Sequence, residues 1–95
     1  MSENGGHISA CLQIAPGQPA GAGYRMGFSI SGREMETGPT DASGCATLDF
    51  PIDVKAKFQP VYAKDGDGQQ FDVKKVPAQG IYRGDKKSID VELKR

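Results

Sequence analysis

Apolar and polar residues alternate along most of this chain, in short runs separated by turn-forming residues. The run YRMGFSI (24–30) places Tyr24, Met26, Phe28 and Ile30 on one face and polar or small residues on the other. A period of two is that of a strand with one buried face. The chain has 13 glycines and 6 prolines among 95 residues, which is typical of short strands with many turns. The pattern therefore predicts an all-β protein.

Seven strands are expected, over residues 7–14, 24–30, 33–37, 45–52, 54–64, 71–76 and 88–95, with a loop over 77–87. Strands spaced by about 8–12 residues predict a seven-stranded antiparallel β-sandwich. In the fifth run Val54, Ala56 and Phe58 have one register and Val61 and Ala63 the opposite one. A bulge or bend near Pro60 would bring both halves to the same side.

The strand expected over 33–37 is charged and has only Met35 to place inward, so it is predicted to be a sheet edge. Ser31-Gly32 predicts a tight hairpin before it. In the PTDASG turn after it, Asp41 and Ser43 are expected to bond nearby amides, and Gly44 to take a positive φ.

Residues 1–6 are polar and glycine-rich and predict a flexible leader, followed by a single domain over 7–95. Lys and Arg number 12, and so do Asp and Glu, so no overall field attracts nucleic acid or an anionic membrane. The start shows no signal-peptide pattern, which favours synthesis in the cytoplasm, with export as part of an assembly left open. Two free thiols are the expectation there, although Cys11 and Cys45 could pair if their strands adjoin.

The segments GQPAGAGYRM, TGPTDASGCATLDF and the final IDVELKR resemble the transthyretin-like (prealbumin-like) β-sandwich family, which includes carboxypeptidase regulatory-like modules. The resemblance covers most of 7–95 and implies a transthyretin- or immunoglobulin-like sandwich. Related domains serve as adhesin stalks, as additions to peptidases and as cargo-docking modules on bacterial secretion spikes and phage-like tails. The run YRMGFSISGREMETGPTDASG is most similar to this last group.

One branch of that family, 5-hydroxyisourate hydrolase, is enzymatic, and the resemblance implies a small hydrolase as an alternative. His7 would match its first histidine, and Tyr82-Arg83-Gly84 its terminal motif. The departures are large: the chain has one histidine, and Asp85 stands where the family has serine. A lone histidine does not supply a positioned general base with its partners. The chain is therefore expected not to be an enzyme, and no catalytic residue is assigned.

The sequence DGDG (65–68) resembles a fragment of a calcium loop, with Asp65 and Asp67 as its carboxylates. A calcium site needs six to eight oxygen ligands, so an ordinary turn is favoured over a metal site. No cofactor is expected.

The expected function is that of a non-catalytic module that docks a protein partner, as an accessory or cargo-adaptor domain of a larger bacterial or phage-like assembly. Loops and edges of rigid sheets usually make such contacts. A stand-alone inhibitor or immunity protein is a further alternative, and a monomer or an edge-to-edge dimer are both open. The residues predicted to bind the partner are Arg33, Glu34, Glu36, Tyr82, Arg83 and Asp85.

Overall fold

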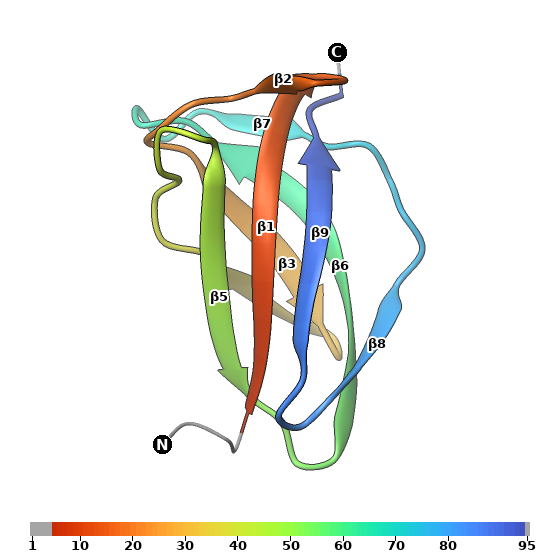
Figure 1. The fold of residues 1–95 in the computed structure, drawn as a ribbon. Helices are drawn as coiled ribbons and strands as arrows, with labels where there is room; N and C mark the ends of the chain where they lie inside the picture. Colours follow the sequence, from red (N-terminus) through yellow and green to blue (C-terminus); the bar gives the residue numbers. More distant parts are fainter. Residues whose placement is uncertain (1–4, 95) are drawn as a thin grey trace.

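Two β-sheets face each other and contain all the strands of the described chain, residues 5–94 of a computed structural model (Figure 1). These residues contain nine strands and no helix, and thus no helix that could cross a membrane. The strands are β1 (Gly5–Ala15), β2 (Gln18–Pro19), β3 (Arg25–Ile30), β4 (Arg33–Glu36), β5 (Cys45–Pro51), β6 (Lys55–Lys64), β7 (Gln70–Asp72), β8 (Gln79–Tyr82) and β9 (Lys86–Glu92).

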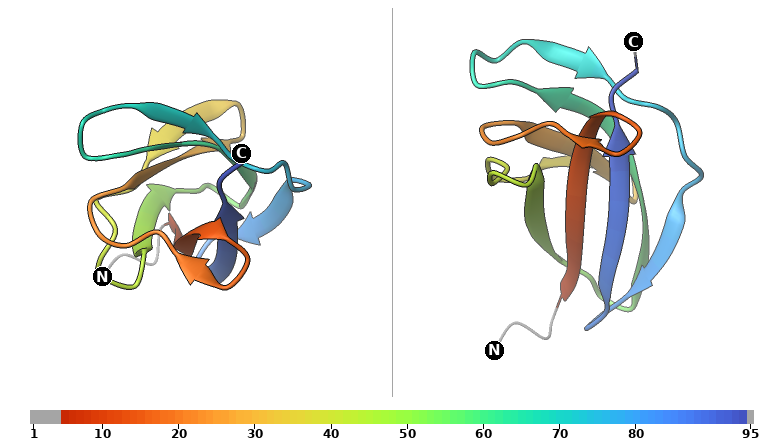
Figure 2. Two further views of the ribbon diagram at one scale, coloured as in Figure 1. Left: turned by 90° about the horizontal axis from the view of Figure 1, so that it is seen from above. Right: turned by 45° about the horizontal axis from the view of Figure 1, so that its top comes forward.

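Strand β1 is the centre of the first sheet. It pairs antiparallel with β5 on one side and parallel with β9 on the other, and β2 pairs with its last residues (Figure 2). The second sheet has the order β4-β3-β6, and β6 pairs on its far side with β8 through its first half and with β7 through its last residues. The central strands β1, β3 and β6 thus hold all the others.

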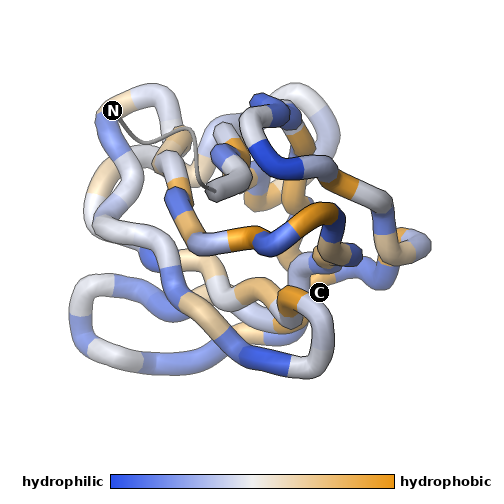
Figure 3. Tube along the Cα trace, turned by 90° about the horizontal axis from the view of Figure 1, so that it is seen from below, coloured by the Kyte–Doolittle hydropathy of each residue, from blue (hydrophilic) through white to orange (hydrophobic). Residues whose placement is uncertain are grey.

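The core lies between the sheets and is built from the inward residue of each alternating pair. Figure 3 shows this alternation as short orange and blue segments along the tube. Phe28 and Phe58, from neighbouring strands of the second sheet, are fully buried with ring centroids 6.3 Å apart. Burial of large apolar side chains is the main favourable contribution to folding. The buried apolar set is Ile8, Ala10, Leu12, Met26, Phe28, Ile30, Ala46, Leu48, Phe50, Ile52, Phe58, Ala63, Val73, Ile81, Val91 and Leu93.

A β-bulge in β6 confirms the irregularity predicted near Pro60. Phe28 pairs with Pro60 and Gly27 with Tyr62, so Val61 has no partner on β3. The extra residue changes the side of the sheet to which later residues point. Phe58 and Pro60 before it and Ala63 after it are consequently all buried. Val54, which shared a register with Phe58 in the sequence, is 70% exposed because β6 begins one residue later.

Other parts of the predicted architecture are wrong. The strand count of seven is too low, because β2 is a separate strand and β8 lies inside the segment predicted as a loop. The sandwich is not wholly antiparallel, because β9 runs parallel to β1 from His7↔Lys86 to Gln13↔Glu92. The predicted leader covers residues 1–6. Residues 1–4 lie outside the described residues, but Gly5 and Gly6 belong to β1 and pair with β5.

The predicted turns are confirmed. Ser31 and Gly32 have φ of 50° and 86° and join β3 to β4 as a two-residue hairpin. In the next turn the carboxylate of Asp41 accepts hydrogen bonds from the amides of Ser43 (2.9 Å) and Cys45 (3.1 Å), and Gly44 has φ 79°. Strand β4 is the edge of the second sheet, as its charge predicted.

Two buried threonines continue the pairing along β3 where β4 ends. Thr37 donates its amide to the carbonyl of Met26 (2.9 Å), and its hydroxyl accepts from the amide of Met26 (3.1 Å). Thr40 repeats both bonds with Tyr24, at 2.7 Å and 3.0 Å. Backbone groups that are removed from water need hydrogen-bond partners. Each threonine provides one donor and one acceptor to the residue opposite, as a paired strand residue would. The chain can therefore leave the edge strand without exposing the core.

Cys11 and Cys45 form a disulfide, so the expectation of two free thiols is wrong. The two residues are direct neighbours in the antiparallel pairing of β1 with β5, with a Cα–Cα distance of 3.9 Å. Cross-strand neighbours project to the same side of a sheet. Ala10 and Ala46 beside them are buried, so the disulfide belongs to the outer face of the first sheet.

Replacing both cysteines by alanine is expected to lower the free energy of unfolding by roughly 3–4 kcal/mol. The bond links residues 34 positions apart, and a loop of that length restricts the unfolded chain by about this amount. Chemical denaturation of the oxidised protein, the reduced protein and the double variant measures the effect. Equal stability of all three, with the thiol count confirmed by mass spectrometry, would contradict the pairing.

Candidate docking surface

The residues predicted to bind a partner come from two places, strand β4 and the turn between β8 and β9. Arg33, Glu34 and Glu36 lie on β4, where Arg33 and Glu34 are exposed and Glu36 is half-buried. Tyr82 ends β8, and Arg83 and Asp85 form the turn that follows. The structure brings one residue of each group, Arg33 and Tyr82, to a common end of the sandwich, and it gives Glu36 contacts elsewhere.

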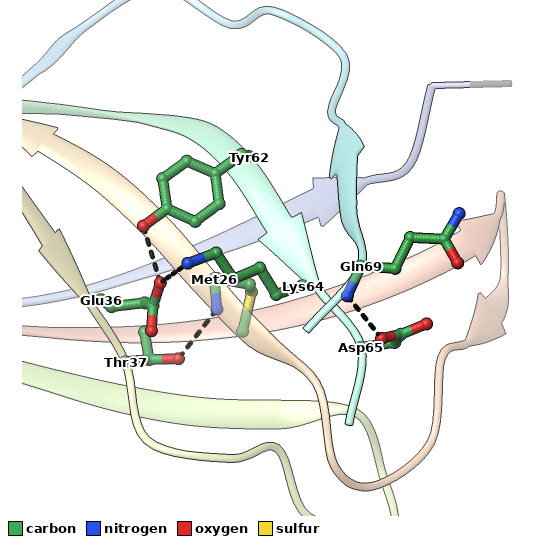
Figure 4. A network of polar contacts seen from close by, with 7 residues as sticks. All are labelled: Met26, Glu36, Thr37, Tyr62, Lys64, Asp65 and Gln69. Atoms are coloured by element: carbon green, nitrogen blue, oxygen red, sulfur yellow. Dashed lines mark hydrogen bonds and ion pairs between the residues drawn. The ribbon is translucent and has the colours of Figure 1, made fainter. Parts of the chain in front are cut away.

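Glu36 is held in a polar network on the outer face of the second sheet (Figure 4). The hydroxyl of Tyr62 donates to its Oε2 at 2.7 Å, and Lys64 Nζ lies 3.2 Å from the same oxygen. Lys64 Nζ also lies 5.3 Å from the centroid of the Tyr62 ring, within the range of a cation–π contact. The network joins the edge strand β4 to β6 across the intervening strand β3.

Gly27 makes this crossing possible. It pairs with Glu36 on one side and with Tyr62 on the other, and the Tyr62 ring lies where a Cβ atom at this position would be. Only glycine leaves the strand surface free for such an approach. The bulge at Val61 sets the same arrangement, because it determines which residue of β6 faces outward beside Gly27.

The network perturbs the two ionisable groups in opposite directions. The hydrogen bond from Tyr62 is the largest cause of the lowered pKa of Glu36, and Lys64 adds to it while burial opposes it. Burial raises the pKa of Tyr62 to about 12, and the hydrogen bond to Glu36 and the charge of Glu36 contribute further. A neutral phenol and an ionised carboxylate are therefore the favoured pair. This arrangement stabilises the sheet and leaves Glu36 less free to bind a partner.

The β8–β9 turn is fixed by its own hydrogen bonds. Asp85 Oδ2 accepts from the amide of Tyr82 (3.0 Å), and the amide of Asp85 donates to the carbonyl of Tyr82 (2.9 Å). The amide of Arg83 donates to the carbonyl of Val54 (3.0 Å), which ties the turn to the start of β6. Tyr82 is thus presented from a well-supported position, with 58% of its surface exposed.

Two adjoining hollows connect the β4 side to the β8 side at this end of the sandwich. One, of about 310 Å³, lies among β6, β8 and β9, and the other, of about 300 Å³, lies between the β3–β4 hairpin and the β5–β6 connection. Both are lined by Ser31, Lys55 and Ala56, so they form one continuous surface. We call it the basic end surface and define it by Arg33, Lys55, Lys57, Tyr82 and Lys87.

The basic end surface is positively charged although the whole chain has a net charge of zero. Four basic side chains line the two hollows against one carboxylate, that of Asp53. The two large hydrophobic residues that are exposed in the described chain, Val54 and Tyr82, also lie at this end. Tyrosine is among the residue types that are enriched in protein–protein interfaces.

Sequence reasoning missed most of this surface. Lys55, Lys57 and Lys87 come from strands 30 residues apart in the chain and had no motif to connect them. The one available signal was the position of Tyr82, an aromatic residue between glycine-containing segments. Pairing of Lys55 with Tyr82 and of Lys57 with Gly80 brings the segments together, and this depends on β8, which the sequence did not reveal as a strand.

The residues considered for a metal site take part in a turn instead. Asp65 Oδ1 accepts hydrogen bonds from the amides of Asp67 and Gln69, both at 2.9 Å (Figure 4 shows the second). The Asp41 carboxylate makes the same pair of bonds in the earlier turn. Among residues 5–94 no three His, Cys, Asp or Glu side chains gather where they could hold a metal ion.

His7 and the Tyr82-Arg83-Gly84 segment, which the sequence compared with 5-hydroxyisourate hydrolase, lie close together in the structure. His7 donates its amide to the carbonyl of Asp85 (3.0 Å), so the start of β1 lies beside the Tyr82–Asp85 turn. The side chain of His7 contacts Asp49 on the outer face, with Nδ1 2.6 Å from Oδ1. A carboxylate beside an imidazole can orient it, but Asp49 is itself 70% exposed at its side chain.

Comparisons of this chain with protein-family models, with curated protein sequences and with solved structures gave no match.

Replacing Gly27 by alanine is expected to lower the free energy of unfolding by about 1–3 kcal/mol, because the new methyl group must displace the Tyr62 ring. Gly38 is the matched control, since no atom lies within 4 Å of a Cβ there and its alanine variant should differ by less than about 0.5 kcal/mol. Denaturant unfolding measures both. In a Tyr62→Ala background, which lacks the ring, the Gly27 substitution should lower the free energy of unfolding much less. If the effects of the two substitutions on the free energy of unfolding simply added, this would argue against the contact.

The stabilising effect of Tyr62 is expected to disappear at high pH. The phenol keeps its proton up to about pH 12 in the folded chain but loses it near 10.0 when unfolded. Its contribution is therefore complete below about pH 10 and is lost as the pH rises towards 12. The difference in unfolding free energy between the wild type and Tyr62→Phe should therefore have its full size at about pH 8 and be smaller at about pH 11. Tyr82→Phe, at an exposed position, is the control. If the difference in unfolding free energy between the wild type and Tyr62→Phe were the same at both pH values, the result would contradict the network.

Proposed function

We propose that this protein is a non-catalytic binding module that docks a protein partner through its basic end surface. The observation that carries the proposal is the joining of the β4 side to the β8 side by two hollows that share Ser31, Lys55 and Ala56. Rigid sheets with short, well-bonded turns suit this task, because little conformational freedom is lost on binding. The exposed Tyr82 ring is the expected central contact, since tyrosine combines a large apolar area with a polar group.

The resemblance to transthyretin-like modules motivates a role as an accessory or cargo-adaptor domain in a larger bacterial or phage-like assembly. A stand-alone inhibitor or immunity protein would use the same kind of surface. Arg33, Tyr82, Arg83 and Asp85 remain the predicted contacts from the sequence, joined now by the lysines of the hollow. Glu34 stays a predicted contact at the exposed edge, and Glu36 would have to leave Tyr62 to make one.

A hydrolase of the hydroxyisourate type is the second candidate, favoured by the closeness of His7 to the Tyr82–Asp85 turn and by its contact with Asp49. A direct assay of the wild type and of His7→Ala decides it. Absence of turnover by the wild type would end this candidate, and turnover lost in the variant would displace the docking proposal.

Arg33→Ser combined with Tyr82→Ser is expected to reduce capture of the native partner at least about tenfold without changing the fold, because both contacts lie on the proposed surface. Capture by the tagged protein from extracts of cells that express it, scored on the partner found with the wild type, gives the measurement. The control is Gln59→Ser with Lys75→Ser, at a separate hollow of about 230 Å³. The proposal is contradicted if the two double variants lose partner capture equally, or if the Arg33/Tyr82 variant loses none.

A further inference from the structure

The hollow among β6, β8 and β9 has a charge pattern that the chain itself does not neutralise. It is lined by three lysines and by no carboxylate. None of the three lysines takes part in the ion pairs found within residues 5–94. Cations that share a small surface repel one another, and an anion bound among them relieves that repulsion. The hollow therefore favours an acidic ligand.

The spacing of the lysines indicates the shape of that ligand. Lys55 and Lys57 stand two residues apart on β6, so they project to the same side at a separation of about 6.6 Å. Residues two apart in an extended peptide have the same spacing. Two acidic side chains at alternate positions of an extended segment would thus face the two lysines together, which a single acidic residue would not do.

The surroundings of the lysines provide room and an apolar contact for such a segment. Tyr82 is the cross-strand neighbour of Lys55, and Gly80 is that of Lys57. No atom lies within 4 Å of a Cβ position at Gly80, so another chain can approach the backbone there. Among the described strands β8 pairs with β6 alone, which leaves its other side without a paired strand. Strand addition beside an unpaired strand is a common way to bind an extended peptide.

We propose that this hollow binds an extended, acidic peptide segment of the partner, with carboxylates at alternate positions on Lys55 and Lys57 and an apolar side chain against Tyr82. The proposal rests on the docking function above and adds the chemistry of the ligand. Lys87, from β9, supplies the third positive charge at the hollow. A nucleic-acid strand fits less well, because such ligands stack on several successive aromatic rings. Here Tyr62 is bonded across Gly27, and Tyr24 and the phenylalanines lie in the core or pack against it. Among residues 5–94, Tyr82 is therefore the one aromatic residue that is largely exposed.

The test uses short synthetic peptides that follow one design and differ in one feature. The first has two glutamates at alternate positions beside leucines, the second has the two glutamates adjacent, and the third has glutamines in their place. Titrations followed by NMR report both the affinity and the amides affected. We expect the first peptide to bind at least about fivefold more tightly than the second, with the largest shifts at Gly80 and Tyr82, and the third not to bind. Equal binding of the first two would overturn the strand-like fit.

Charge reversal locates the effect. Lys55→Glu with Lys57→Glu should reduce affinity for the first peptide about tenfold or more, because two attractions become repulsions. The control reverses Lys75 and Lys94, which line the hollow near Pro60 and give the same change in net charge. Equal loss in both variants would overturn the proposal in favour of non-specific attraction. If the charge reversal unfolds the protein, Lys55→Gln with Lys57→Gln is used in its place, and a loss of affinity for the first peptide is still expected.

Three further outcomes test the nature of the ligand and separate this proposal from the docking function. Tighter binding of anionic phospholipid vesicles or of a single-stranded oligonucleotide than of the first peptide would overturn the acidic-peptide ligand. Partner capture that depends on Tyr82 but is unchanged by reversal of Lys55 and Lys57 would leave the docking function standing and reject the acidic ligand. Capture that is insensitive to both changes would reject the two proposals together.

Discussion

The second sheet depends on the need to bury both halves of β6 on the same side. Phe58 and Pro60 have one register in the sequence and Ala63 has the other, and a regular strand would bury one group and expose the other. The unpaired Val61 resolves this conflict at the cost of one irregular position in the pairing with β3. Along the side of β6 that faces away from β3, the residues before the bulge pair with β8 and those after it pair with β7.

The consequences of the bulge reach the surface on both sides. After the bulge in the chain, Tyr62 lies over Gly27 and donates a hydrogen bond to Glu36. The edge strand β4 is therefore attached to β6 by side chains as well as through β3. Before the bulge in the chain, the start of β6 pairs with β8, which brings Tyr82 beside Lys55. The predicted docking residues on β4 are thereby divided. Glu36 contributes to the stability of the sheet, whereas Arg33 joins the basic end surface.

The first sheet is held together differently. Its central strand β1 has a neighbour on each side over most of its length, and the disulfide fixes the register with β5 at Cys11. Parallel pairing with β9 brings the last strand beside the first, so the start of β1 meets the β8–β9 turn. This closure places Lys87 at the hollow and His7 beside Asp85. The position of the candidate surface therefore depends on both sheets.

The sequence by itself determined the features that depend on neighbours in the chain: the strands other than β2 and β8, the Ser31-Gly32 hairpin, the Asp41 turn, the edge character of β4 and the irregularity near Pro60. Local alternation and turn chemistry are enough for these. Tertiary structure alone decided the parallel pairing of β9, the strand β8, the disulfide, and the grouping of Tyr82 with Lys55 and Lys57. Each of these depends on which distant segments become neighbours, and that follows from how the whole core packs, because alternation alone is compatible with many pairings.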